Sequence, residues 1–241
     1  MPDSPDYSKY LIGSVRFSLQ DMGELAARLG SLSTFDRRGE VAFMETFMGG
    51  LGAWQTNASG TGGSVSLVAN PTYRNPFAVK LITGSTASKN AQISKSIGVA
   101  ELTSIGVEIF IAPTTLYDTI MLRLSAQFNS IEYTGELQIK NTPAIFQVVN
   151  SLSVSETVGA HGTLETTDGN YTPFKLVIDL STAKYKRVIA AGQEIDVSTI
   201  AIQQSAGSDT NLIMATIRLT AESAANRVGY VAQCIITANE P

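Results

Sequence analysis

Cysteine and charged residues are both scarce in this sequence. Cys234 is the only cysteine among 241 residues, so no disulfide can form within the chain and nothing requires an oxidising compartment. Charged residues make up 16% of the chain, against roughly 25% in an average soluble domain. The net charge of −4 gives no basic surface for a phosphate backbone, so we expect no nucleic-acid partner.

Long apolar runs and a targeting segment are also missing. The first six residues contain two prolines and two aspartates, without the basic and apolar regions that are typical of a secretory signal. Apolar stretches such as residues 107–112 fall far short of the ~18 residues that predict a membrane span. We therefore expect synthesis in a cytoplasm and no membrane association.

Catalytic residue combinations are hard to assemble from this sequence. His161 is the only histidine, so a histidine metal site lacks a second ligand, and a nucleophilic site is excluded unless His161 serves as its sole base. Cys234 falls in a predicted strand, where a buried thiol is inert. Four carboxylates also occupy predicted strands, but Glu108 stands alone among apolar neighbours and the others alternate toward solvent: Glu132, Glu136 and Asp179. We expect a protein that binds or assembles and is not an enzyme.

The hydrophobic period changes near residue 40, which predicts two regions. Residues 1–39 contain an apolar arm and then one short amphipathic helix, with Ser18 and Asp21 in a capping pattern and an end near Gly30. Such an arm is too apolar for a free tail, so we expect it to anchor the protein. Seven side chains are the assembly candidates: Tyr7, Tyr10, Ile12, Phe17, Met22, Leu25 and Leu29.

Residues 40–241 alternate between apolar and polar side chains. The alternation is clearest over residues 105–111 and 120–128, and it returns in shorter runs to the end of the chain. Four polar segments read as turns: residues 57–63, 70–75, 159–170 and 203–211. Many short strands between such turns predict an all-β fold, a two-sheet antiparallel jelly-roll sandwich in one domain.

The order of sequence features from Glu45 to Pro241 resembles that of carbohydrate-binding modules and concanavalin-like domains. The segments that carry the resemblance are residues 45–47 followed by Trp54, then residues 78–84, 105–110, 174–180 with Lys184-Tyr185, and 229–237. The resemblance implies a jelly-roll sandwich, often with a structural calcium. Met48, Ala232 and Gln233 stand where such modules carry carboxylates, so we expect no metal and no cofactor.

A sandwich preceded by an arm and a short helix also resembles proteins that tailed bacteriophages place on their virions. This resemblance implies a structural virion protein, a capsid decoration or fibre-like protein, made in the host cytoplasm and then placed on the virion surface. The expected partners are the major capsid or other virion proteins and further copies of the same chain. Low charge leaves strand edges poorly protected, so we expect a homo-oligomer, with a trimer as the leading hypothesis.

The alternative is a carbohydrate-binding module or lectin that recognises a glycan through aromatic rings. Its candidate platform is a set of four aromatic residues: Trp54, Tyr73, Tyr117 and Tyr171. The competing interpretation places Trp54 as a plug at one end of the sandwich and the tyrosines at the rim. Both functions can coexist on one virion protein, which leaves surface glycans as possible partners.

Overall fold

The structure of the chain is a computed structural model. It describes residues 36, 38–73, 76–99, 103–114, 117–162, 164, 169–208 and 210–241. The predicted arm, the helix and the seven assembly candidates lie outside the described residues. The predicted boundary after residue 39 therefore stays a prediction.

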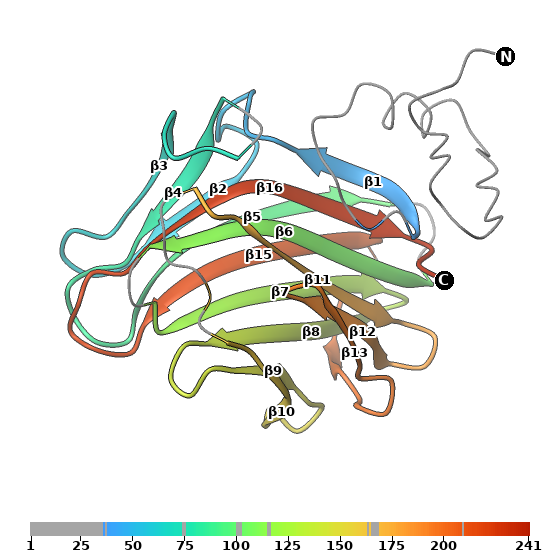
Figure 1. Ribbon diagram of the computed structural model, residues 1–241. Coiled ribbons are helices and arrows are strands. Elements are labelled where there is room, and N and C mark those ends of the chain that lie inside the picture. Colours follow the sequence, from blue (N-terminus) through green and yellow to red (C-terminus); the bar gives the residue numbers. More distant parts are fainter. Residues whose placement is uncertain are drawn as a thin grey trace, which may run out of the picture. The chain divides into compact units, whose positions relative to one another are not determined.

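Two antiparallel sheets form the sandwich (Figure 1). Sheet A has the strand order β13-β12-β11-β6-β16-β4-β3, and β1 also pairs with β16. In chain order its strands are β1 (Glu40–Glu45), β3 (Ser64–Val68), β4 (Ala78–Ile82), β6 (Ser104–Thr114), β11 (Thr172–Asp179), β12 (Lys184–Ala190), β13 (Gln193–Asp196) and β16 (Val228–Ala238).

Sheet B has the strand order β10-β9-β8-β7-β15-β5-β2, and β14 also pairs with β8. In chain order its strands are β2 (Gln55–Ala58), β5 (Lys89–Gly98), β7 (Thr119–Phe128), β8 (Ile131–Lys140), β9 (Ile145–Val149), β10 (Ser155–Ala160), β14 (Gln203–Ala206) and β15 (Leu212–Ala221). Because strands that follow one another in sequence often lie in different sheets, the connections cross between the layers. The predicted all-β fold with two antiparallel sheets is confirmed.

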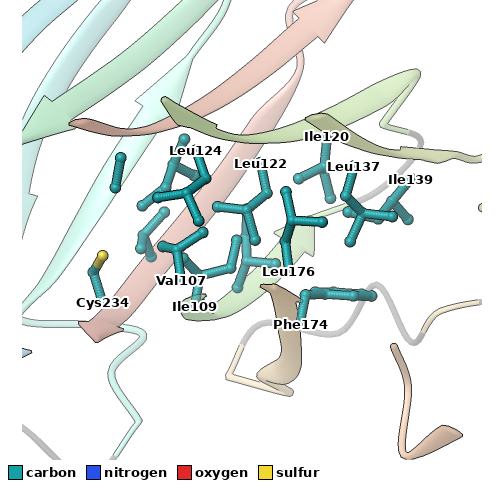
Figure 2. Close-up of a cluster of buried hydrophobic side chains, with 14 of the residues drawn as sticks. Val107, Ile109, Ile120, Leu122, Leu124, Leu137, Ile139, Phe174, Leu176 and Cys234 are labelled. Carbon is teal, nitrogen blue, oxygen red and sulfur yellow. The ribbon is translucent and has the colours of Figure 1, made fainter. Parts of the chain in front are cut away.

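The core lies between the two sheets and follows directly from the alternation in the sequence. Figure 2 shows the inward side chains of β6, β11 and β16 facing those of β7 and β8. The labelled residues have no exposed surface: Val107, Ile109, Phe174, Leu176 and Cys234 from sheet A, and Ile120, Leu122, Leu124, Leu137 and Ile139 from sheet B. Each large aliphatic side chain buried in this way contributes about 1.5 to 3 kcal/mol.

Three predicted turn segments begin as strands instead. Residue 57 lies in β2, residue 159 lies in β10 and residue 203 begins β14. β2 and β14 are only four residues long and carry mostly polar, exposed side chains, so they lack the apolar alternation that predicts a strand.

Candidate functional site

The outer face of sheet B is almost entirely polar. Apolar side chains of β15 at Ile213, Ala215, Ile217 and Leu219 point into the core, which turns the residues between them outward. The registers of adjacent strands then align the outward residues in rows across the sheet. One row runs Asn57, Gln92, Arg218, Met121, Gln138 and Gln147, and the next runs Gln55, Ser94, Thr216, Arg123 and Glu136.

A groove with a volume of about 330 Å³ lies on this face, where β14 and the β9–β10 turn border the sheet. We call it the polar groove. Nine of its ten lining residues are polar, and Met214 is the exception: Arg123, Ser125, Glu132, Thr134, Ser151, Ser153, Gln203, Gln204, Ser205 and Met214. The groove therefore offers hydrogen-bond donors and acceptors in nearly every direction.

Hydrogen bonds hold several of these groups in place. Arg123 Nε and Nη2 donate to Glu136 Oε2 at 2.9 and 2.7 Å, and Gln138 Nε2 donates to the other carboxylate oxygen at 2.7 Å. Ser125 and Thr134 share a hydrogen bond of 3.0 Å between their hydroxyls. Because the Glu136 side chain is only 10% exposed, its charge is stabilised mainly by these two donors.

The β9–β10 turn is ordered by Asn150, and it places serines against the groove. Asn150 Oδ1 accepts hydrogen bonds from the backbone N–H of Leu152 at 2.9 Å and of Val154 at 3.0 Å. Gln203 Nε2 donates to Ser153 Oγ at 2.9 Å, which ties the turn to β14. Leu152 and Val154 alternate with these serines and are 80% and 53% exposed, so an apolar contact surface lies beside the polar groove.

The structure does not assemble the predicted aromatic platform. Trp54 is 6% exposed and packs against Phe47 and Phe43, and Tyr117 is fully buried in the same core. Neither ring can stack on a sugar, because neither presents a face to solvent. Tyr73 and Tyr171 do lie together, with ring centroids 5.6 Å apart, and Tyr73 also stacks on Phe110 of β6 in sheet A.

A buried ionic cluster occupies the outer face of sheet A. Lys175 Nζ lies 2.6 Å from Glu240 Oε1 and 3.0 Å from Asp36 Oδ2, and Arg187 also pairs with Glu240. The backbone N–H of Asp36 donates to Glu108 Oε2 at 3.0 Å. Three carboxyl groups thus share the two buried cations, and Asp36 also pairs with the more exposed Arg38 at 3.0 Å. The cluster fastens both Asp36 and the end of the chain to β6, β11 and β12.

Burial raises the pKa of Glu108 from 4.5 to about 7, and the carboxylates of Asp36 and Glu240 add to the rise, whereas the Asp36 N–H and Lys175 oppose it. In the unfolded chain the carboxyl loses its proton near pH 4.5, but in the folded chain it keeps the proton until about pH 7. This group therefore stabilises the fold fully below pH 4.5, and that stability is lost as the pH rises through 7.

Glu108→Gln is expected to remove this dependence, because the amide has no proton to lose. Urea unfolding at pH 5 and pH 8 measures the effect. Between pH 5 and pH 8 the free energy of unfolding of the unchanged protein should fall by roughly 2 to 3 kcal/mol more than that of the variant. If the unfolding free energies of the variant and the unchanged protein differ by the same amount at pH 5 and at pH 8, Glu108 does not hold its proton in the fold.

The structure does not bring the four carboxylates singled out from the sequence together as a catalytic pair. Glu108 lies on the opposite sheet from Glu132 and Glu136, which are four residues apart on one strand and so separated by roughly 13 Å. That spacing exceeds both carboxylate separations used by glycosidases. Asp179 accepts hydrogen bonds from Ser181 and Thr182 in a turn. Glu136 lies on the outward face of β8, as the alternation predicts, but Arg123 and Gln138 cover its carboxylate.

His161 and Cys234 have structural environments. His161 Nδ1 lies 2.6 Å from the Gly162 carbonyl oxygen and Nε2 lies 2.8 Å from that of Lys140, so both ring nitrogens face backbone. Cys234 is fully buried, and burial raises the pKa of its thiol. In the described part of the chain, no three histidine, cysteine or acidic residues are grouped to hold a metal ion, and no helix is long and apolar enough to cross a bilayer.

Sequence reasoning missed Arg123, Glu136 and Arg218 as site residues. The sequence did carry a signal for them, because each is a charged residue at an outward position of a strand whose inward side chains are apolar. What the sequence lacked was the strand order that makes β7, β8 and β15 neighbours. Without that order, three charges distant in sequence gave no reason to be considered together.

No protein-family model matches the chain, and no curated protein matches it. Solved structures do match. A protein of unknown function from Shewanella oneidensis MR-1 superposes with a TM-score of 0.55 at 14% identity, covering 92% of this chain and 96% of the other. A carbohydrate esterase from the Shiga toxin-encoding bacteriophage phi24B has a TM-score of 0.53 at 11% identity, covering 84% of this chain and 100% of the other.

The carbohydrate recognition domain of Emp47p is a third match. Its TM-score is 0.51 at 9% identity, and the match covers 86% of this chain and 99% of that domain. Identities this low show the fold alone. The chain has a jelly-roll β-sandwich that resembles the sandwiches of lectin-like and carbohydrate-binding domains, as the sequence resemblance implied.

Proposed function

We propose that this protein binds a saccharide on the outer face of sheet B, in the polar groove. The observation that carries the proposal is the groove itself, with nine polar lining residues on one face of a lectin-like sandwich. The recognition domain of Emp47p and the phage esterase, two proteins of similar fold, are named for carbohydrate. Their names support this class of ligand.

The chemistry of the groove suits a sugar. Each sugar hydroxyl both donates and accepts a hydrogen bond, and the serine, threonine and glutamine side chains of the groove do the same. The bonds between Ser125 and Thr134 and between Gln203 and Ser153 hold these groups in place before a ligand arrives, which lowers the entropy lost on binding. The exposed Leu152 can contact the C–H face of a sugar ring, a role that the buried Trp54 and Tyr117 cannot take.

We propose binding without catalysis. A general acid or base must reach the ligand in a defined protonation state. Glu136 is instead occupied by Arg123 and Gln138, and His161 is held between backbone carbonyls. Among the described residues that line the groove, Glu132 is the only acidic one, so it has no second carboxylate to act with. The resemblance to the phage esterase is therefore one of fold.

A groove-filling substitution tests the proposal. Ser205 is exposed on the short strand β14, so Ser205→Phe is expected to block the polar groove without disturbing the core. The matched control is Ser66→Phe, on the edge strand β3 of the other sheet. On an array of immobilised oligosaccharides the unchanged protein and the control should bind the same members, and Ser205→Phe should bind them at least tenfold more weakly. Equal binding by all three proteins would contradict the assigned site.

The second candidate function is the structural virion protein expected from the sequence. The observation in its favour is the similar fold of a bacteriophage protein. This function places a homo-oligomer, with a trimer as the leading state, on a virion surface beside capsid proteins. Sedimentation velocity of the full chain at micromolar concentration measures that state, and a monomer of 25.6 kDa would contradict the assembly role.

A further inference from the structure

Arg218 is an arginine without a carboxylate partner in the middle of the polar face. It lies on β15 and its Nε donates to Gln92 Oε1 at 2.7 Å. Within the residues that the structure describes, no carboxylate lies within 4.0 Å of its guanidinium and its two terminal nitrogens have no hydrogen-bond partner. The side chain is half-buried, but its terminal nitrogens are not among the buried side-chain atoms that lack a partner, so they are accessible to water or to a ligand.

A second arginine lies diagonally across from it. Arg218 pairs in register with Met121, and Arg123 pairs with Thr216, so the two arginines occupy diagonal positions on adjacent strands. Diagonal side chains of this length reach one another. The electrostatics agree, because burial and then the charge of Arg123 lower the pKa of Arg218, and the charge of Glu136 opposes them only in part.

The local charge does not balance. Arg218 and Arg123 belong to two neighbouring rows of outward residues on sheet B, and Glu136 is the carboxylate in these rows. Its two oxygens already accept hydrogen bonds from Arg123 and Gln138. Two guanidinium groups therefore share one carboxylate on a half-buried face, in a chain whose overall charge is −4. The extra positive charge is available to attract an anionic ligand.

We propose that this face binds an acidic saccharide, whose carboxylate lies between Arg218 and Arg123. The proposal rests on the proposed saccharide function and adds the chemical class of the ligand. Guanidinium groups form paired, charge-assisted hydrogen bonds with carboxylates, and Arg218 has the unused donors for them. Gln92 and Gln138 flank this position and supply neutral partners for the hydroxyls of the same sugar ring.

The test uses acidic oligosaccharides, each paired with its carboxyl-reduced form. The pairs are oligomers of glucuronate, galacturonate, mannuronate and sialic acid, so the two members differ only in the charged group. For the full chain, we expect the best-bound acidic member to bind at least tenfold more tightly than its reduced form, and the preference to weaken as salt rises. Arg218→Gln should bring the ratio of the two affinities to about one, and Arg218→Lys should keep part of it.

The control variant is Lys184→Gln, which removes one positive charge from an exposed position on sheet A and should leave the ratio unchanged. Equal affinity for both members of every pair would overturn the acidic preference and leave saccharide binding intact. A preference that survives in Arg218→Gln would also overturn it. Failure of the unchanged protein to bind any member, acidic or neutral, would contradict the proposed function as well.

Discussion

Lys175→Met is expected to destabilise the fold by roughly 3 to 5 kcal/mol, the effect of removing one partner from a buried ion pair. The Lys175 side chain is 1% exposed, and that of its partner Glu240 is fully buried. Methionine fills most of the space but supplies no charge. Glu240 would then pair only with Arg187, while Asp36 would keep Arg38 at 3.0 Å and the more distant Arg187. Glu240 would lose one of its two cations although its side chain has no exposed surface.

Urea unfolding measures this loss. Lys184→Met is the matched control, because Lys184 is an exposed lysine on the neighbouring strand β12 and its loss should change stability by less than ~0.5 kcal/mol. A loss below about 1 kcal/mol in Lys175→Met would show that the cluster does not depend on the lysine charge.

Gly135→Ala is expected to destabilise the fold by about 1 to 3 kcal/mol through overpacking. Gly135 lies on the inner face of β8, and a Cβ there would be 2.5 Å from Ile178 Cγ2 and 3.2 Å from Tyr185 Cε1, both in sheet A. Tyr185 cannot easily move aside, since its hydroxyl donates to the Val149 carbonyl at 2.7 Å and accepts the Glu136 N–H at 2.9 Å. The two sheets would have to separate locally.

The control is Gly49→Ala, where a Cβ meets nothing within 4 Å. Thermal unfolding of both variants gives the comparison. A melting temperature for Gly135→Ala equal to that of Gly49→Ala would mean that the sheets are packed less closely at this point than the structure shows.

The hydrophobic alternation predicted the strands that build the core and failed where strands are polar. Residues 105–111 and 120–128 became the centres of β6 and β7, because burial of every second side chain decides both the period and the strand. β14 gave no such signal, since its residues Gln203–Ala206 form a strand only by pairing with β8. Local sequence cannot show a partner that lies so far away along the chain.

The candidate site was harder to predict than the fold. Aromatic residues drew the prediction to Trp54 and Tyr117, whose large apolar rings are buried in the core instead. The face that now carries the proposal is made of ordinary polar residues such as Ser125 and Thr134, which on a single strand look like any solvent-exposed surface. Only the strand order brings Thr134 of β8 and Arg218 of β15 beside Arg123 and Ser125 of β7.

The central claim is that the outer face of sheet B is a saccharide-binding surface, and amide NMR shifts test it most directly. The saccharide bound most tightly on the array is titrated into the isotope-labelled protein. The account predicts shift changes concentrated in β7, β8, β14 and β15 around the polar groove. Changes confined to sheet A, for example around Tyr73 and Tyr171, or no bound saccharide at all, would contradict it.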